Sequence, residues 1–259
     1  MELYKATLKR IKPLNTEVAA EAKKILDEKM KPLGSLGKLE ELAIQISGIT
    51  GRLDNTVLKK LHLVASADNG IVEEGVSSCP VEYTKIVSEA MLSKVAAIGI
   101  LCDTLGVDFK LIDIGIAEEI DREYPNLYRK NIKKGTNNFV YEPAMTYNEC
   151  IKAIEVGISI VEENLDYDIF SNGEMGIGNT TTSSAILYAL TREQLDLIVG
   201  RGGGLSDRGL IKKKKVIKDA IEKYNLFEND PIDRGSSCLS NNNFGFRSNE
   251  KDENSKRSL

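Results

Sequence analysis

The chain has 259 residues, of which 41% are hydrophobic and 29% are charged, and its formal net charge is −4. This length and composition predict one large globular domain, with or without a small second one, rather than a coiled coil, a collagen or a wholly disordered protein. The slightly acidic balance argues against a nucleic acid as partner, and no apolar run approaches the roughly 20 residues that span a membrane.

The first 50 residues are predicted to form a small helical domain. Apolar side chains recur every three or four residues between positions 17 and 30, and again between positions 36 and 48. Ser35 is expected to cap the second helix, because its hydroxyl can accept a hydrogen bond from a first-turn amide. The chain begins without the apolar core of a secretion signal, which predicts a cytoplasmic protein.

From residue 51 onward, short apolar strands alternate with helices, and each strand runs into a loop rich in Gly or Asp. The four predicted strands cover residues 61–65, 109–112, 167–170 and 195–199. One long helix is predicted over residues 84–105 and another over 148–164, before which Thr146 and Glu149 form a capping-box pattern. This alternation predicts an α/β fold with a mostly parallel sheet flanked by helices. Ligands of such folds bind at the carboxyl ends of the strands.

The last 26 residues, 234–259, have a different composition, with six Ser, five Asn and only five apolar residues. They show neither a helical nor a strand period, so they are predicted to form a disordered tail. A second interpretation is that this segment is not native coding sequence. The helix predicted over residues 212–223 and the Asp-Pro-Ile-Asp string at 230–233 lead toward a structured unit that does not follow.

The first candidate site is the segment 173–182, which follows a predicted strand. Its glycines allow backbone amides to approach a ligand, and free amides at the start of the next helix favour an anion such as phosphate. The alternative is a tight turn between a strand and a helix. Glu174 favours the functional role, because a carboxylate beside an anion site would repel phosphate unless it faced another part of the ligand.

A second glycine-rich segment, residues 200–207, follows the last predicted strand. It has the composition of another amide cradle, and lysines at 212–215 follow on a helix, so one lysine could reach a bound anion. The alternative is a solvated helix face, to which at least two of these lysines are assigned. Leu205 breaks the spacing of a dinucleotide fingerprint. Together the two segments predict a phosphorylated sugar or a nucleotide as the ligand.

Several carboxylates also follow predicted strands, namely Asp68, Glu73, Glu74 and Asp113. Such groups can bind ribose hydroxyls, a metal or a cationic ring, but they can equally cap helices or pair with lysines. His62 is the only histidine and lies within a predicted strand, where a structural role is expected. A His-based triad or metal cage is therefore not predicted, and any general base is expected to be a carboxylate.

Six motifs, taken in chain order, resemble those of one known family. They cover residues 31–43, 68–80, 135–137, 143–146, 173–181 and 200–205. Over roughly residues 31–233 the chain is similar to the nicotinate-nucleotide–dimethylbenzimidazole phosphoribosyltransferases of the cobalamin nucleotide-loop pathway. The string Glu-Met-Gly-Ile-Gly-Asn-Thr-Thr, which begins at Glu174, is the most specific of these motifs.

The resemblance implies a reaction and an architecture. A phosphoribosyl group passes from nicotinate mononucleotide to a ring nitrogen of a lower-ligand base such as 5,6-dimethylbenzimidazole, which gives α-ribazole 5′-phosphate and nicotinate. The resemblance also implies a Rossmann-like domain over residues 51–233 and a small helical domain built from both chain ends. A homodimer of the full-length chain is implied as well, with no cofactor and no required metal.

The resemblance further implies roles for individual residues. Glu174 would support the positive charge that develops at the anomeric carbon. The 5′-phosphate would be bound by backbone amides and one lysine, at Gly176, Ile177, Gly178, Gly202, Gly203, Gly204 and Lys213. The incoming base would face Ser77, Lys85 and Met175.

The chain departs from this family at several positions. Cys79 stands where a Tyr or Phe is common and Lys85 where a Gln is common, both in the segment that receives the base, so the base could be a benzimidazole, a substituted benzimidazole, a purine or a phenolic compound. Gly203 stands where a Thr is common. Residues 234–259 lack the family's Gly-Glu-Gly motif, whose Glu is the proposed general base. The sequence thus predicts a chain truncated or frameshifted after about Asp233, with little or no transferase activity. The alternatives are an inactive nucleotide-binding module and an NAD-dependent oxidoreductase, which the missing fingerprint disfavours.

Overall fold

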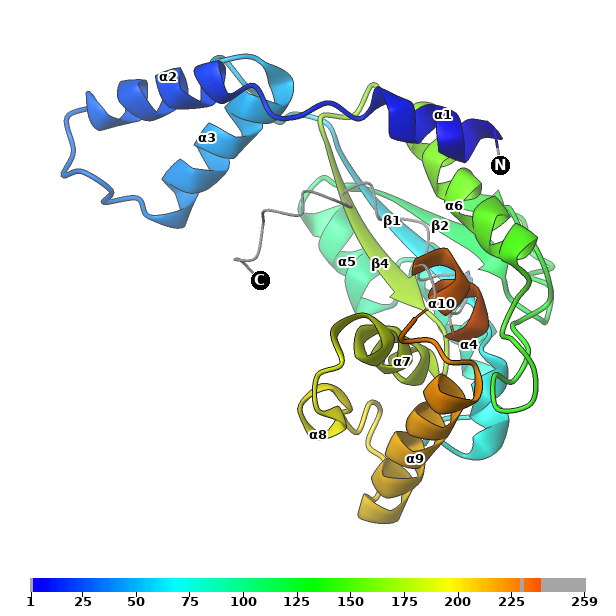
Figure 1. The fold of residues 1–259 in the computed structure, drawn as a ribbon. Coiled ribbons are helices and arrows are strands. Elements are labelled where there is room, and N and C mark those ends of the chain that lie inside the picture. The colour runs from blue at the N-terminus through cyan, green and yellow to red at the C-terminus, as the bar shows by residue number, and fades with distance from the viewer. Residues whose placement is uncertain (1, 229–230, 239–259) are drawn as a thin grey trace. The chain divides into compact units, whose positions relative to one another are not determined.

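The computed structural model describes residues 2–228 and 231–238, which belong to two compact units. One unit is Lys5–Leu58, and the other consists of the described residues on either side of it. Helix α1 (Glu2–Arg10) spans the boundary between the two units. Figure 1 shows the elements of both. None of the helices in the described residues combines the length and the apolar character that crossing a membrane requires.

Two helices make up most of the smaller unit, α2 (Thr16–Asp27) and α3 (Lys38–Thr50). They pack against each other, and a Cβ atom at Gly48 would lie 3.3 Å from the Cβ atom of Ala19, so glycine permits the close approach. Asn15 caps α2, because its side chain accepts a hydrogen bond from a first-turn amide. Both helices predicted from the apolar spacing are therefore confirmed.

The predicted cap at Ser35 is wrong, because α3 begins two residues later than expected. Its N-cap is Gly37, which makes no side-chain hydrogen bond. The preceding residues form two tight turns, in which the amides of Ser35 and Gly37 donate to the carbonyls of Pro32 and Gly34 at 3.1 and 2.9 Å. Positive φ angles at Gly34 and Gly37 permit these turns. The glycines thus delay the helix past the residue that looked like its cap.

The larger unit is built on a four-stranded sheet in which all neighbouring strands are parallel. The strands are β1 (Lys60–Ala67), β2 (Asp108–Gly115), β3 (Leu127–Arg129) and β4 (Ile169–Met175). Their spatial order is β3-β2-β1-β4. The predicted α/β fold with a parallel sheet is confirmed. The sequence does not predict β3, because three residues are too few for a strand pattern to show.

Helices cover both faces of this sheet. Successive side chains of a strand point to opposite faces. Ala65 of β1 lies in the apolar cluster on the side of α6 (Tyr147–Glu162), whereas Val64 lies in the cluster on the side of α4 (Tyr83–Leu92) and α5 (Ala97–Thr104). Because β1 is central and covered twice, it is apolar along most of its length, which is why the sequence predicts it readily.

The single long helix predicted from residue 84 is interrupted between α4 and α5. The amide of Ala96 donates to the carbonyl of Ala90 at 3.1 Å, and Lys94 has a left-handed φ of 58°. A Cβ atom at Gly99 would lie 2.8 Å from the Cα atom of Lys94, so glycine permits the corner. The apolar spacing continues across this corner, and for that reason the sequence predicts one helix instead of two.

The next predicted helix is confirmed as α6, together with its capping box. The Thr146 hydroxyl accepts from the amide of Glu149 at 3.2 Å, and the Glu149 carboxylate accepts from the amide of Thr146 at 2.7 Å. The strand predicted over residues 195–199 is wrong, since this segment contains the short helix α8 (Leu195–Ile198). Its two end residues pack on a core cluster, and a spacing of three residues is helical, but so short a segment does not distinguish helix from strand.

The disordered tail predicted at the C-terminus begins with a helix instead. Helix α10 (Pro231–Cys238) packs against α6 and α7 (Asn179–Thr191), as Figure 1 shows. The amide of Met145 donates to the carbonyl of Ser236 at 2.9 Å, and the Ser236 side chain is buried. Small serine side chains fit between these neighbours, so a composition typical of disorder conceals a packed helix. The rest of the predicted tail, residues 239–259, lies outside the described residues.

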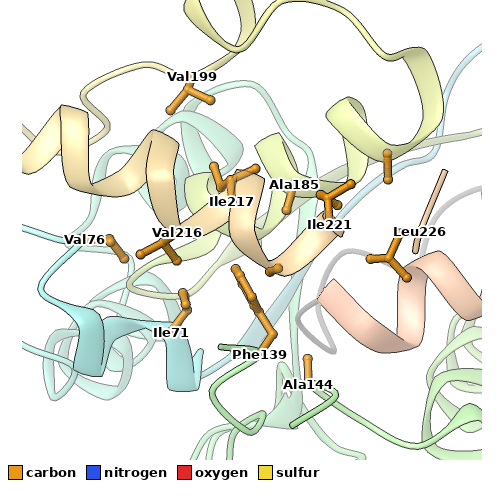
Figure 2. Packing of buried hydrophobic residues seen from close by; sticks show 12 residues of the cluster. Ile71, Val76, Phe139, Ala144, Ala185, Val199, Val216, Ile217, Ile221 and Leu226 are labelled. Carbon is orange, nitrogen blue, oxygen red and sulfur yellow. The ribbon is translucent and has the colours of Figure 1, made fainter. Parts of the chain in front are cut away.

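A third apolar cluster joins α7 to α9 (Asp207–Lys223). Figure 2 shows Ile217 and Ile221 of α9 beside Ala185 of α7, with Phe139 below them. All four side chains are almost completely buried. Because α7 and α9 begin just after the two glycine-rich segments, this cluster fixes where those segments lie.

Replacing Ile217 by Ala is expected to lower the free energy of unfolding by about 2–5 kcal/mol, because the side chain is fully buried and its loss leaves a cavity. The control is Ile211→Ala on the same helix, where the side chain is 70% exposed and the change should stay within about 0.5 kcal/mol. Urea unfolding followed by circular dichroism measures both variants. Equal effects would contradict tight packing between α7 and α9.

Candidate functional site

The carboxyl ends of β1, β2 and β4 meet at one edge of the sheet, as the parallel order requires. The Nδ2 atom of Asn69, just after β1, donates to the carbonyl of Ile177, just after β4, at 2.9 Å. On the other side, the amide of Ala117, just after β2, donates to the carboxylate of Asp68 at 2.8 Å. Three loops that are far apart in the sequence are therefore joined by direct hydrogen bonds.

The first glycine loop, residues 176–178, leads from β4 directly into α7. Gly178 is the N-cap of α7 and has a φ of 87°. A Cβ atom at this position would lie 2.7 Å from the Cγ2 atom of Val72, which belongs to the 3₁₀ helix η1 (Gly70–Glu74). The left-handed backbone and the close approach of η1 both require glycine. They bring the first amides of α7 to the carboxyl edge of the sheet.

Backbone amides near this loop already have partners within the protein, and those of Asn179 and Thr181 donate to carbonyls within the turn itself. The amide of Ile177 donates to Oγ1 of Thr84 on α4 at 3.1 Å, and the amide of Thr180 donates to Oδ1 of Asn179 at 2.7 Å. An anion that used either amide would have to share or displace these hydrogen bonds. Ile177 is therefore a less direct anion ligand than the sequence suggests.

The second glycine loop, residues 200–204, lies against the start of α7. A Cβ atom at Gly202 would lie 2.9 Å from Oγ1 of Thr180. Gly202 and Gly204 have positive φ angles of 56° and 106°, and the amide of Gly204 donates to the carbonyl of Arg201 at 3.3 Å. The structure thus brings together the two glycine-rich segments that the sequence singles out.

The segment between η1 and α4 also contacts the second glycine loop. The hydroxyl of Ser78 donates to the carbonyl of Gly203 at 2.8 Å. A Cβ atom at Gly203 would lie 3.2 Å from this hydroxyl oxygen and 3.9 Å from Sγ of Cys79. The segment predicted to receive a base and a loop predicted to bind phosphate are therefore neighbours.

Lys213 of α9 lies behind both glycine loops, with its side chain fully buried. Its Nζ atom donates to Oγ1 of Thr180 at 2.7 Å and to the carbonyl of Gly200 at 3.1 Å. Burial disfavours the ammonium form and lowers the pKa of Lys213 to about 8. The Lys213 ammonium is thus hydrogen-bonded to the second glycine loop and to the first turn of α7, close to the anion site that the sequence predicts.

The lysines beside Lys213 have other surroundings. Lys212 and Lys215 are exposed, and Lys215 pairs with Asp219 one turn further along α9. Lys214 pairs with Asp196 of α8. The predicted solvated face of α9 is therefore confirmed for two of the four lysines.

Glu174 lies on β4 opposite Ala65 of β1, close to the start of α7. The Nδ2 atom of Asn179 donates to both carboxylate oxygens, at 2.6 and 2.8 Å. The side chain keeps exposed surface, yet the protein around the carboxylate removes enough water to raise the pKa of Glu174, and the Asn179 hydrogen bond opposes that shift. A carboxylate and the candidate anion site thus share the first turn of α7.

The three residues predicted to face a base have different partners. The hydroxyl of Ser77 donates to the carbonyl of Cys79 at 3.2 Å. The Nζ atom of Lys85 on α4 lies 2.7 Å from the Glu118 carboxylate, which raises the pKa of this lysine. Met175 ends β4 and packs on the apolar cluster beneath α4. All three residues come from elements at the carboxyl edge of the sheet.

Two buried carboxylates, one just after β1 and one near the end of β2, bind the protein's own backbone. The Oδ1 atom of Asp113 accepts from the amides of Gly115 and Ile116 at 3.1 and 2.9 Å. Asp68 accepts from the amide of Ala117. Burial raises the pKa of both carboxyl groups. Both residues thus shape the turns at the ends of these strands, a role that the sequence does not suggest.

In the described part of the chain, no group of three or more His, Cys, Asp and Glu side chains could hold a metal ion. The Nδ1 atom of His62 lies 2.7 Å from the hydroxyl of Ser171 on β4, and its ring stacks on Phe109 with a centroid distance of 6.1 Å. Burial lowers the pKa of His62. These contacts between strands support the structural role predicted for this histidine.

Three residues that are not among the predicted site residues bond to the candidate site. Thr84 binds the amide of Ile177, and Asn179 binds Glu174. Thr180 accepts from the buried lysine of α9. The Asn-Thr-Thr string directly after the first glycine loop carries a signal for two of them, since a first helical turn seldom needs three polar residues. Their partners lie on other elements, which the sequence does not place.

Replacing Gly178 by Ala is expected to lower the free energy of unfolding by at least about 2 kcal/mol. A left-handed φ costs an L residue roughly 1–2 kcal/mol, and the added Cβ atom would also collide with Val72. The control is Gly75→Ala, where φ is 64° but no described atom lies within 4 Å of the added Cβ atom. Thermal unfolding of both variants tests the close approach of η1, which equal losses would contradict.

A family model, curated relatives and solved structures all match this chain. A family model described as phosphoribosyltransferase matches residues 11–238. The match reaches past residue 233, where the resemblance seen in the sequence ends, and it includes α10.

Two curated relatives are named nicotinate-nucleotide–dimethylbenzimidazole phosphoribosyltransferase. The protein from Clostridium tetani is 44% identical over 235 residues, which cover 90% of this chain and 64% of that protein. The protein from Acetivibrio thermocellus is 44% identical over 229 residues, which cover 88% of this chain and 65% of that protein. This chain therefore spans slightly less than two thirds of the length of these relatives.

The fold is similar to that of a solved structure, CobT from Thermus thermophilus. The TM-score is 0.84 at 29% sequence identity, and the match covers 88% of this chain and 69% of that chain. A second structure from the same organism, of its nicotinate-nucleotide–dimethylbenzimidazole phosphoribosyltransferase, matches with a TM-score of 0.83 at 28% identity, over 90% of this chain and 69% of that chain.

Proposed function

Because this chain belongs to the phosphoribosyltransferase family, we propose that it transfers a phosphoribosyl group from nicotinate mononucleotide to a ring nitrogen of a benzimidazole-type base. The products are α-ribazole 5′-phosphate, or its analogue, and nicotinate. The observation that carries the proposal is the convergence of the second glycine loop and the first turn of α7 on the buried amine of Lys213, with Glu174 at the same helix start. The names of the relatives support the choice of substrates.

The phosphate of the nucleotide binds, in this proposal, between the two glycine loops. The backbone at Gly202 and Gly203 supplies amides, and the start of α7 after Gly178 supplies the positive end of a helix dipole. Lys213 adds positive charge from behind the second loop. Two of the three N–H bonds of its ammonium are used by Thr180 and Gly200, which leaves one donor for the ligand.

The sugar lies, in this proposal, between the phosphate and Glu174. The bond from the anomeric carbon to nicotinate breaks while a bond to the base nitrogen forms, so positive charge develops at that carbon, and the N–H proton of the base passes to water. A carboxylate fixed near the carbon stabilises this charge more in the transition state than in the bound nucleotide. Glu174 is placed for this supporting role by its position beside the first turn of α7.

The base is received, in this proposal, by Ser77, Lys85 and Met175 at the carboxyl edge of the sheet. Lys85 carries a charge that Glu118 balances, so the pocket offers a polar group as well as the apolar Met175. This combination suits a flat aromatic ring with nitrogen or oxygen acceptors. A homodimer and a cytoplasmic location, which the family resemblance implies, are parts of the same proposal.

The transferase activity is tested by incubating the chain with nicotinate mononucleotide and a panel of benzimidazole, purine and phenolic bases. Equal amounts of nicotinate and of a new ribotide identify the reaction, however slow it is. Glu174→Gln should lower kcat at least about tenfold, since it removes the charge that supports the transition state. Binding of nicotinate mononucleotide without any turnover would instead indicate an inactive nucleotide-binding module, and absence of binding would contradict both.

The affinity for nicotinate mononucleotide is expected to fall as the pH rises through about 8, where the Lys213 ammonium loses its proton. The lowered pKa means that the charge is present below about pH 8 and lost above it. The phosphate group remains a dianion throughout this range. Calorimetry at pH 7 and pH 9 should show roughly tenfold weaker binding at the higher pH. Lys213→Met should bind weakly at both values, and an equally steep pH dependence in this variant would assign the effect to another group.

A further inference from the structure

A continuous chain of hydrogen bonds runs from the candidate carboxylate to the buried lysine. The side chain of Asn179 donates to Glu174, and its Oδ1 atom accepts from the amide of Thr180 at 2.7 Å. The hydroxyl of Thr180 then accepts from Nζ of Lys213 at 2.7 Å. Two consecutive residues at the start of α7 thus connect the negative and the positive group of the site.

The two ends of the Asn179 amide are distinguished by their partners. The amide of Thr180 is a donor and can be bound only by the oxygen of the side chain. The nitrogen therefore faces Glu174, whose ionised carboxylate only accepts hydrogen bonds. The orientation of the Asn179 amide follows from its surroundings, and a reversed orientation would lose both contacts.

Asn179 does not act as the usual cap of α7. The N-cap position belongs to Gly178, which has no side chain, whereas Ser206 caps α9 in the usual manner by accepting from the amide of Gly209. Asn179 instead occupies the first helical position and reaches back to the end of β4. A residue that only stabilised the helix would not need to hold both oxygens of a carboxylate on a neighbouring strand.

We propose that Asn179 is a positioning residue, which holds the Glu174 carboxylate ionised and in one orientation and ties it to the anion half of the site through Thr180. A single nitrogen within 2.6 and 2.8 Å of the two oxygens restricts rotation of the carboxylate. Hydrogen bonds to the charged form also favour ionisation. The part of this inference that concerns catalysis rests on the proposed phosphoribosyl transfer.

The electrostatic surroundings of Glu174 agree with this role. Burial raises the pKa of Glu174, and the Asn179 hydrogen bond lowers it. Burial is the stronger of these two influences, so the pKa stays above its ordinary value even with the hydrogen bond in place. Asn179 therefore opposes the tendency of the surroundings to protonate the carboxylate.

The direct test is a pH titration of the Glu174 carboxyl group by NMR, with 13C-labelled glutamate and with Glu174→Gln to assign the signal. Asn179→Ala should raise the titration midpoint by about one pH unit, because a charge-assisted hydrogen bond is lost. Asn179→Asp should raise it further, because it places a second carboxylate beside the first. The matched control is Thr180→Val, which removes the contact with Lys213 and leaves the bond from Asn179 to Glu174.

Asn179→Asp keeps an oxygen for the amide of Thr180, so it preserves the first turn of α7 if Asn179→Ala does not fold. If the titration midpoint of Glu174 in Asn179→Ala and Asn179→Asp stays within about 0.3 pH units of the wild-type value, the proposal is overturned. This titration needs no substrate, so a failure of the proposed transfer reaction does not affect it. Where turnover is measured, Asn179→Asp should lower kcat at least about tenfold and change KM for nicotinate mononucleotide less than about threefold.

Discussion

Lys213 carries an ammonium group into the interior of the protein, and a buried charge is stable only where hydrogen bonds replace the water it has lost. Thr180 and the carbonyl of Gly200 supply these bonds. The position of the amine is fixed from the other side, because the next turn of α9 packs Ile217 into the cluster shared with α7. The backbone of the second glycine loop and the first turn of α7 therefore have to lie where they can reach the amine.

The small residues around this amine follow from the same constraint. A side chain at Gly202 would meet the hydroxyl of Thr180, and one at Gly203 would meet the hydroxyl of Ser78. The backbone of this loop comes within hydrogen-bond distance of Lys213 on α9 and of Ser78, and side chains at these glycines would hold the neighbouring segments apart. The glycine content that suggests a phosphate cradle in the sequence is thus also the condition for burying the lysine.

Much of the fold follows from local patterns in the sequence. The central strands are covered on both faces and read as apolar runs, and the capping box of α6 is visible as Thr146 and Glu149. Local patterns fail to predict those elements whose structure is determined by packing against other parts of the chain. The corner between α4 and α5 depends on Gly99 fitting against Lys94, and α8 is too short for its period to be recognised. Helix α10 is held by its neighbours, which its serine-rich composition does not reveal.

The sequence likewise predicts only part of the candidate site. Gly178 stands out in the sequence as part of a glycine-rich segment, and the family resemblance singles out Lys213 among four neighbouring lysines; in the structure both lie at the start of α7. Thr84 and Asn179 do not stand out, because each bonds to a residue that is distant along the chain or on another element, Thr84 to the amide of Ile177 and Asn179 to the Glu174 carboxylate. Such a pair is invisible until the elements are placed in space. Residue type therefore indicates where a site lies, whereas the contacts within it depend on the tertiary structure.

The order of the strands also has a consequence for how the protein is made. β1 ends at Ala67, but β4, its neighbour on one side, begins only at Ile169. At roughly 5–20 residues per second, a ribosome needs on the order of 5–20 s to add the roughly 100 residues between them. Ile71, directly after β1, waits even longer for the helices that bury it, since Ile217 belongs to α9. The glycine loops are held together only after that helix has left the ribosome, so the candidate site is completed later than the central strands β1 and β2.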